Sequence, residues 1–310
     1  MYSNSGYMFS QVGRPRGLFN LGQSCFMNAI VQSLMATKFK EFCLSNAGFV
    51  NNQWILFGNL VEVISALNDE GDPFNMVNFV DSVESISQFR RKVQADAQEF
   101  LSFVLETIHD ELTIVVEHQV SDPLQDIETH GLGEVVKSHW ETRKSTSPIA
   151  EFFHVQTVTL MECPSCKNSS GQFNDVNHLL SVPMPSPLEG PKSVAPSNPT
   201  ITDCIAEYCK QQTLLDGHCS SCESLGLQHR LLLGRLPPVL IVHLKRFYRH
   251  FDGTMRKSQT SVSICPELDL APFTLYDGQS TLYRAVGVTN HRGQVLHLGH
   301  YMTISQRGDR

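Results

Sequence analysis

The 310-residue sequence predicts an α+β fold, with a helical part followed by a β-rich part. Up to about residue 112, apolar side chains recur every three or four residues, which is the spacing of amphipathic helices. From about residue 151, segments rich in β-branched and aromatic residues come between turn signals. With 41% hydrophobic residues the chain can bury a sizeable core, in one large domain with subregions or in two small ones.

Composition excludes several classes of protein. The net charge is −7 and no long basic run occurs, so direct binding to nucleic acid is not expected. No segment approaches the ~18–20 apolar residues of a membrane span, and the N-terminus lacks the pattern of a secretory signal. Nine cysteines, with two CxxC pairs, indicate a reducing compartment. We therefore expect a cytoplasmic or nuclear protein that is neither secreted nor membrane-bound.

The stretch 17–34, GLFNLGQSCFMNAIVQSL, places Cys25 at the start of a helix-periodic run. Ser24 precedes it as a candidate N-cap. A thiol at a helix N-terminus has a lowered pKa and is a nucleophile. Asn20 is placed to donate a hydrogen bond to an oxyanion beside the sulfur. The alternative is that Cys25 is a small buried apolar residue, the usual fate of a free cysteine.

Three further helices are expected in the first part of the chain. Two patterns, at about 54–67 and 74–83, are separated by the turn 68–73. The third covers residues 93–112, where apolar residues recur at four-residue spacing. Asp96 and Glu99 fit an acidic capping box at its start. From spacing alone, Asp96 is a helix cap.

The second part of the chain reads as alternating strands, loops and one helix. Trp140 is the expected anchor of its first segment. The predicted segments are a polar surface connection at 118–150, a strand at 152–163, a proline-rich loop at 183–199, a helix at 201–215 and a buried strand at 236–242.

Two CxxC pairs offer four thiolates to one tetrahedral Zn²⁺. They are Cys163 with Cys166, and Cys219 with Cys222. The rival interpretation is a redox CxxC, which predicts one active pair beside a βαβ unit. The remaining cysteines besides Cys25 lack partner spacing and are expected in the core; they are Cys43, Cys204, Cys209 and Cys265.

A thiolate nucleophile needs a general base. Histidines cluster near the C-terminus at His291, His297 and His300, and Gly299-His300-Tyr301 leads into a strand-like end. This cluster is where the sequence places the base.

These motifs resemble those of the ubiquitin-specific proteases, which are papain-like cysteine peptidases. The segment 17–34 resembles the family's cysteine box, QADAQEF at 94–100 its second motif, HLKRF at 243–247 a strand motif, and Gly299-His300-Tyr301 its histidine box. The match in the cysteine box covers Gly17, Leu18, Asn20, Leu21, Gly22, Ser24, Cys25, Phe26, Met27, Asn28, Gln32 and Leu34. The resemblance spans about residues 17–304.

The resemblance implies a papain-like hand of thumb, palm and fingers. The expected divisions are a flexible leader at 1–16 and a catalytic domain at 17–310, made of a helical thumb (17–150), zinc-bearing fingers with part of the palm (151–232) and an incomplete palm (233–310). It also implies a thiol-dependent deubiquitinase that cleaves isopeptide or peptide bonds at the C-terminal glycine of ubiquitin. Cys25 would be the nucleophile, Asn20 an oxyanion donor and His300 the base.

The implied partners are ubiquitin and ubiquitinated proteins. The ubiquitin tail would lie between Cys25 and His300 and contact Asp96, Gly299 and Tyr301. The fingers would hold a structural zinc. PELDLAPF at 266–273 also resembles the histone-deubiquitinating subgroup of the SAGA coactivator complex, which implies a multi-subunit assembly.

One departure from the family concerns the third catalytic residue. In the family an Asp or Asn some fifteen to twenty residues beyond the histidine box orients the base, whereas this chain stops at Arg310. We therefore expect a C-terminally truncated palm. Three functions stay open: an active peptidase, a catalytically weak or silent ubiquitin-binding module, and a zinc-stabilised scaffold without a ubiquitin role.

Overall fold

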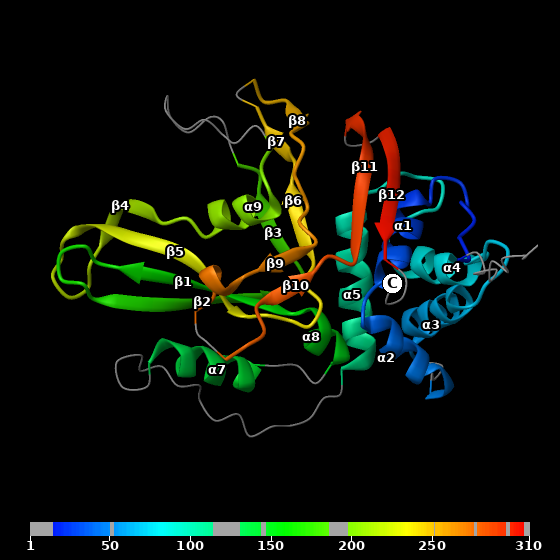
Figure 1. Cartoon of the computed structure of the whole chain (residues 1–310), viewed down its shortest axis with the longest axis horizontal. Helices are drawn as coiled ribbons and strands as arrows, with labels where there is room; N and C mark the ends of the chain where they lie inside the picture. Colours follow the sequence, from blue (N-terminus) through cyan, green and yellow to red (C-terminus); the bar gives the residue numbers. More distant parts are fainter. Residues whose placement is uncertain are drawn as a thin grey trace, which may run out of the picture.

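The computed structural model describes residues 15–49, 53–113, 131–143, 147–185, 198–250, 252–275, 278–295 and 298–306. It confirms the α+β class: a group of helices lies beside a β-rich part, and a long hairpin stands against the helices (Figure 1). Residues 1–14 of the expected leader lie outside the described residues. Pro15 already pairs with Glu70, and Arg16 donates to the carbonyl of Ala66, so the leader's last two residues contact the helical part.

The helices are α1 (Cys25–Leu34), α2 (Phe39–Ser45), η1 (Ala47–Phe49), α3 (Ile55–Asn68), α4 (Val77–Ile86), α5 (Ala97–Leu112), α7 (Leu132–Arg143), α8 (Pro148–Phe153), α9 (Ile201–Tyr208) and η2 (Ala271–Phe273). The strands are β1 (Val155–Glu162), β2 (Ser169–Asn177), β3 (Leu180–Pro183), β4 (Gln212–His218), β5 (Leu225–Arg235), β6 (Val242–Lys245), β7 (Phe247–Arg249), β8 (Met255–Lys257), β9 (Glu267–Asp269), β10 (Leu282–Arg284), β11 (Gly287–Val295) and β12 (Leu298–Ser305). None of the helices in the described residues is long and apolar enough to cross a bilayer.

The helical part is built around one apolar core to which α1, α3, α4 and α5 contribute. Phe26 of α1 meets Phe100 of α5 edge to face, with ring centres 5.3 Å apart. The N-terminus of α3 lacks a local side-chain cap. Instead the Glu111 carboxylate of α5 accepts the N–H groups of Leu56 and Phe57, each at 2.8 Å. The core and this contact hold the helices in one unit.

The β-rich part contains a four-stranded antiparallel sheet in the order β2-β1-β5-β4. Helix α7 packs on it, because an added Cβ at Gly234 of β5 would lie only 3.0 Å from Val136 of α7. Trp140 of α7 is buried as expected, with the Arg235 guanidinium 4.0 Å from the ring centre. A smaller apolar core lies between α9, β3 and β6, the last two being paired in parallel.

Several predicted elements were wrong in extent. The segment 118–150 is not a plain connection, because its described residues form α7 and the start of α8. The predicted helix at 201–215 ends at Tyr208, and residues 212–218 are strand β4. The predicted strand at 236–242 begins only at Val242. Cys43, Cys204 and Cys209 are in the core as expected, whereas Cys265 is exposed.

Helix α5 begins at Ala97 rather than at residue 93, because Asp96 caps it. Oδ1 of Asp96 accepts the N–H groups of Gln98 at 2.7 Å and Glu99 at 3.2 Å. The capping prediction for Asp96 is confirmed, and it leaves Oδ2 available for another contact.

Three histidines from separate elements form a cluster. The ring centre of His154, after α8, lies 4.6 Å from that of His178 and 5.3 Å from that of His109 in α5. Burial lowers the pKa of all three, to about 3 for His154 and about 4 for His178. The group is therefore neutral in the folded protein at neutral pH.

Asp96→Ala is expected to lower the free energy of unfolding by about 1 kcal/mol, because two N–H groups lose their acceptor. Asp96→Asn keeps a capping oxygen and is expected to stay within a few tenths of a kcal/mol of wild type. Urea unfolding measures both. An equal loss in the two variants would show that the charge, rather than the cap, stabilises α5.

The histidine group makes stability depend on pH. Below the ordinary histidine pKa of about 6.5 the unfolded chain binds protons that the folded chain does not, so stability falls by at most about 1.4 kcal/mol per pH unit for each histidine. We expect the fall between pH 7 and pH 5.5 to be smaller in His154→Gln than in wild type, as measured by urea unfolding. His229→Gln, outside the group, is the control, and an equal fall in both variants would contradict the prediction.

Candidate active site

Cys25 is the first residue of α1 and is 7% exposed. Ser24 occupies the N-cap position as expected, but its hydroxyl makes no capping bond. That hydroxyl accepts the N–H of Leu21 at 2.9 Å and donates to Oδ1 of Asn20 at 3.1 Å. The first N–H groups of α1 are thus left uncapped by Ser24 beside the thiol, where they favour an anion.

The loop before Cys25 fixes the orientation of Asn20. Its Oδ1 also accepts the N–H of Ser24 at 3.1 Å. Within the described part of the chain, no atom accepts a hydrogen bond from the Asn20 side-chain NH₂, and the residue is exposed. The oxygen is therefore engaged and the donor is available, which is the arrangement that an oxyanion donor needs.

Asp96 and Tyr301 bring α5 and β12 together beside Cys25. The Tyr301 hydroxyl donates to Oδ2 of Asp96 at 3.3 Å. Burial and the Asp96 carboxylate, with a smaller contribution from Cys25, raise the pKa of Tyr301 well above its ordinary value. Two predicted site residues thus lie side by side and within electrostatic reach of the predicted nucleophile.

The predicted base, His300, lies between Gly299 and Tyr301 on β12. Gln94 brackets Gly299: its NH₂ donates to the Gly299 carbonyl at 2.9 Å, and its oxygen accepts the Gly299 N–H at 3.1 Å. His300 is exposed whereas both neighbours are half-buried, so its imidazole lies on the opposite face of β12 from the Tyr301 phenol. Among the described residues, His300 makes no hydrogen bond to Cys25. The fold brings the histidine strand to the cysteine helix without pairing the two side chains.

A second histidine, His291, lies on the face of the hairpin that holds Tyr301. The two ring centres are 4.7 Å apart. Lys257 of β8 lies 3.0 Å from Nδ1 of His291 and donates to the carbonyls of His291 and Gly293 at 2.9 and 2.8 Å. Burial and Lys257 lower the pKa of His291. His297 lies outside the described residues.

Gln94 and Lys257 are site residues that the sequence did not single out. Gln94 stands in the quoted motif QADAQEF, but its partner Gly299 is 205 residues away. No local pattern marks Lys257. Both residues reach the site through contacts with residues distant in the sequence, and no local sequence pattern reveals such contacts.

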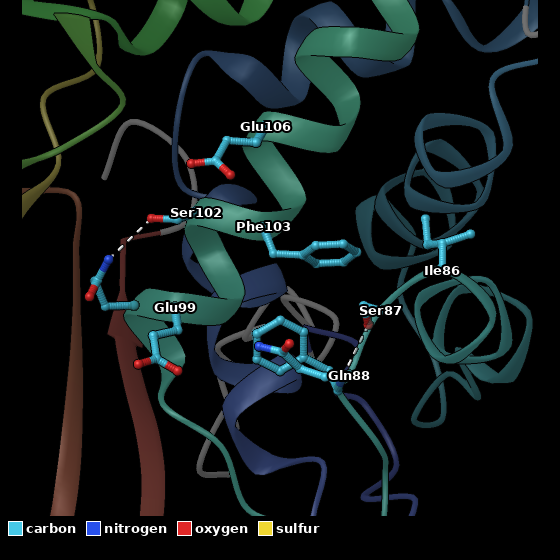
Figure 2. Close-up of a pocket in the computed structure, with 9 residues that line it drawn as sticks. Ile86, Ser87, Gln88, Glu99, Ser102, Phe103 and Glu106 are labelled. Carbon is cyan, nitrogen blue, oxygen red and sulfur yellow. Dashed lines mark hydrogen bonds between the residues drawn. The ribbon is translucent and has the colours of Figure 1, made fainter. Parts of the chain in front are cut away.

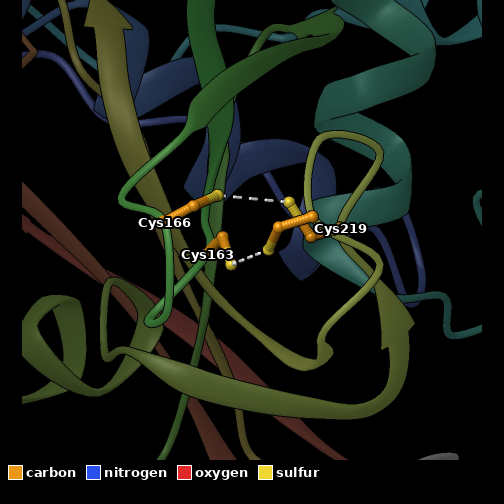
Figure 3. Close-up of side chains that lie close together, drawn as sticks. Cys163, Cys166 and Cys219 are labelled. Atoms are coloured by element: carbon orange, nitrogen blue, oxygen red, sulfur yellow. Dashed lines mark hydrogen bonds between the residues drawn. The ribbon is translucent and has the colours of Figure 1, made fainter.

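The four predicted metal ligands converge at the far end of the four-stranded sheet (Figure 3). All four sulfurs lie within 4.8 Å of one another. Cys163 and Cys222 are 3.7 Å apart, and Cys166 and Cys219 are 3.5 Å apart, so these contacts run between the pairs. Sulfurs around a tetrahedral zinc at 2.3 Å are about 3.8 Å apart. The donor set and its spacing fit such an ion.

The two CxxC turns have the same backbone geometry. In each, the residue after the second cysteine has a left-handed φ, 62° at Lys167 and 59° at Glu223. Its N–H donates to the carbonyl of the first cysteine, Cys163 or Cys219, at 2.9 Å. Two matching turns thus present their sulfurs to one point.

A shallow hollow of about 480 Å³ lies along α5, near its capped end (Figure 2). Glu99 and Glu106 contribute carboxylates to its lining, and Ile86 and Phe103 contribute apolar surface. Such an open, acidic and partly apolar surface suits an extended basic peptide better than an enclosed small molecule.

Two curated proteins with similar sequences are both named ubiquitin carboxyl-terminal hydrolases. The chain is 27% identical over 349 residues to ubiquitin carboxyl-terminal hydrolase 4 of Eremothecium gossypii, covering 94% of this chain and 38% of the relative. It is 27% identical over 318 residues to human ubiquitin carboxyl-terminal hydrolase 21, covering 93% of this chain and 55% of the relative. The chain thus spans 38% and 55% of the length of these two relatives.

Solved structures share the fold. The SAGA Ubp8/Sgf11/Sus1/Sgf73 DUB module bound to ubiquitin aldehyde aligns with a TM-score of 0.73 at 20% identity, covering 94% of this chain and 62% of that one. A second structure of this module, carrying a Ubp8 variant and bound to monoubiquitin, aligns with a TM-score of 0.72 at 20% identity, covering 94% of this chain and 61% of that one. This likeness confirms the expected protease fold.

A family model described as ubiquitin carboxyl-terminal hydrolase matches residues 16–310, nearly the whole described structure. On this match, the chain belongs to the ubiquitin carboxyl-terminal hydrolase family, as its cysteine and histidine motifs had indicated.

Proposed function

We propose that this chain is a cysteine-type deubiquitinase that hydrolyses isopeptide or peptide bonds at the C-terminal glycine of ubiquitin. The carrying observation is that α1, which begins at Cys25, packs against both α5 and β12, the two elements that the Asp96–Tyr301 hydrogen bond joins. A thiol at the N-terminus of a helix that packs against a histidine-bearing strand is an arrangement in which a general base can activate a nucleophile.

The Cys25 sulfur would attack the carbonyl carbon of the terminal glycine while His300 takes the thiol proton. The negative charge then develops on the carbonyl oxygen, where the Asn20 NH₂ and the Cys25 backbone N–H would donate hydrogen bonds. The tetrahedral intermediate would collapse to a thioester as His300 returns the proton to the leaving amine. Water, deprotonated by His300, would then cleave the thioester and release the ubiquitin carboxylate and the free thiol.

Substrate contacts would come from Asp96, Gly299 and Tyr301. Asp96 offers a carboxylate whose position is fixed by the cap, and the acidic hollow along α5 suits the approach of a basic segment. The structural neighbours named above are bound to ubiquitin and assembled with other subunits. We therefore propose ubiquitin and ubiquitinated proteins as partners, within a multi-subunit complex.

A catalytically silent ubiquitin-binding module is the second candidate. The exposed position of His300 on β12 favours it, because an imidazole on that face needs a rearrangement to reach Cys25. The rest of the surface proposed for the ubiquitin tail is the same for both candidates.

We also propose that the four cysteines hold one structural zinc. Contacts between the pairs, rather than within either one, support a metal site over a redox CxxC. The ion would join the β1–β2 turn to the β4–β5 turn and supply stability rather than chemistry. With all nine cysteines free, a reducing compartment, cytoplasm or nucleus, is proposed as the location.

Release of a fluorophore from the ubiquitin C-terminus tests the activity. Cys25→Ala is expected to abolish release while ubiquitin affinity stays near that of wild type, because the side chain supplies the nucleophile rather than binding surface. Steady-state kinetics and a binding titration measure the two effects. Activity retained by Cys25→Ala rejects the nucleophile; silence of both proteins with ubiquitin still bound selects the binding module.

Metal analysis of the purified chain is expected to find about one zinc per molecule. Cys166→Ser and Cys222→Ser, which change the two exposed ligands, are each expected to lose the ion and to lower the melting temperature. Cys265→Ser, which changes an exposed cysteine outside the group, is the control. A metal-free chain with the same melting temperature as a zinc-loaded one would reject the site.

A further inference from the structure

One short segment touches both halves of the candidate site. The backbone carbonyl of Arg91 accepts the N–H of Gln23, in the loop before Cys25, at 2.6 Å. Three residues later, the Gln94 side chain holds both backbone groups of Gly299 beside the histidine position. Residues 91–96 are called the bridging segment here, because they join the cysteine loop to β12.

The Arg91 backbone also lies in close contact with the cysteine loop, in addition to its hydrogen bond with Gln23. Gly22 has a φ of +119°, and an added Cβ there would lie 3.0 Å from the Arg91 carbonyl oxygen. The loop therefore takes a path that glycine allows, directly against the backbone of Arg91. Movement of that backbone would shift the loop that carries Asn20.

The bridging segment is in turn anchored to α4. Oε1 of Glu84 accepts the backbone N–H of Arg91 at 2.6 Å and its Nε at 3.1 Å, and Oε2 accepts Nη2 at 2.9 Å. Asp81 also contacts Nη2 of Arg91. The Arg91 and Glu84 side chains are only 22% and 23% exposed. One carboxylate thus fixes both the main chain and the side chain of Arg91, in the two-pronged geometry that gives arginine pairs their specificity.

We propose that Arg91 and Glu84 are positioning residues for catalysis, which hold the bridging segment so that the cysteine loop and β12 stay aligned. Neither side chain is part of the proposed chemistry. Their effect on turnover rests on the proposed function, whereas their effect on the two attached backbones rests on the contacts alone. Small displacements of reacting groups reduce rates strongly, so loss of the anchor acts on kcat rather than on affinity.

The kinetic test compares Arg91→Met, Glu84→Gln and the double variant with wild type. Each is expected to lower kcat for the ubiquitin fluorophore substrate by roughly 5- to 20-fold while KM changes less than about twofold. The double variant is expected to resemble the single variants, because each of them already removes the ion pair between the Glu84 and Arg91 side chains. Lys38→Met is the control: it removes a cation from an exposed residue outside the bridging segment, before α2, and is expected to keep kcat.

Amide hydrogen exchange gives a readout that needs no activity. Exchange at the N–H groups of Gln23 and Gly299 is expected to rise several-fold in Arg91→Met and Glu84→Gln, without a rise in the interior of α5 and without a change in Lys38→Met. Unchanged exchange at both sites, a rise spread over the whole helical part, or raised exchange with wild-type kcat would each overturn the proposal. If wild type itself is inactive, the proposed function fails and the exchange result alone decides whether the anchor aligns the two backbones.

Discussion

The candidate site depends on the interface between α1 and the β11–β12 hairpin. Thr303 of β12 donates its hydroxyl to the Ala29 carbonyl at 2.9 Å, and its oxygen lies 2.7 Å from the Thr289 hydroxyl. Ser33 of α1 contacts both threonines, at 2.8 and 3.2 Å. These hydroxyls satisfy one another in a half-buried place, so sliding the hairpin would leave one of them without a partner at a cost of about 1–3 kcal/mol. A shift of one residue would also exchange the faces of His300 and its neighbours.

Much of the helical part could be predicted from the sequence, because α1, α3 and α5 carry clear apolar periods. Helix α2 was not predicted, and the helix expected at 74–83 lies at Val77–Ile86 as α4. The predictions for α1 and α3 were right to within a residue, and the core residues of α5 recur at the predicted spacing. Helix α7 was missed because its outer surface is polar and its apolar period is weak. At 201–215 the apolar content was recognised but not the change of period at Cys209, where the helix ends and the chain turns into β4.

The sequence motifs named individual candidate residues of the site but not their geometry. Cysteine spacing sufficed to predict the four-cysteine cluster, and the pairing of β1 with β5 brings the two CxxC turns together. The motifs singled out Asp96 and Tyr301 separately, and the structure places the two side chains in contact. Sequence could not show that Asp96 divides its two oxygens between a helix cap and a tyrosine, nor that His300 faces solvent. Those outcomes depend on how β12 is positioned against residues 94–96. Contacts between residues more than 200 positions apart in the sequence set that position.

Two parts of the chain should differ in how well they tolerate inserted or deleted residues: the stretch between the two CxxC turns, and the turns themselves. Cys166 and Cys219 are 53 residues apart, and the excursion between them carries β2, β3, α9 and β4. These elements are packed, because β2 and β4 pair in the four-stranded sheet and β3 and α9 share the smaller apolar core, so length can change freely only in the loops between them. Doubling the length of such a loop costs only about 0.6 kcal/mol of entropy. The two CxxC turns have no such freedom, since one inserted residue would rotate a sulfur away from the other three. Changes in length should therefore collect in the loops between these elements and spare the two cysteine turns.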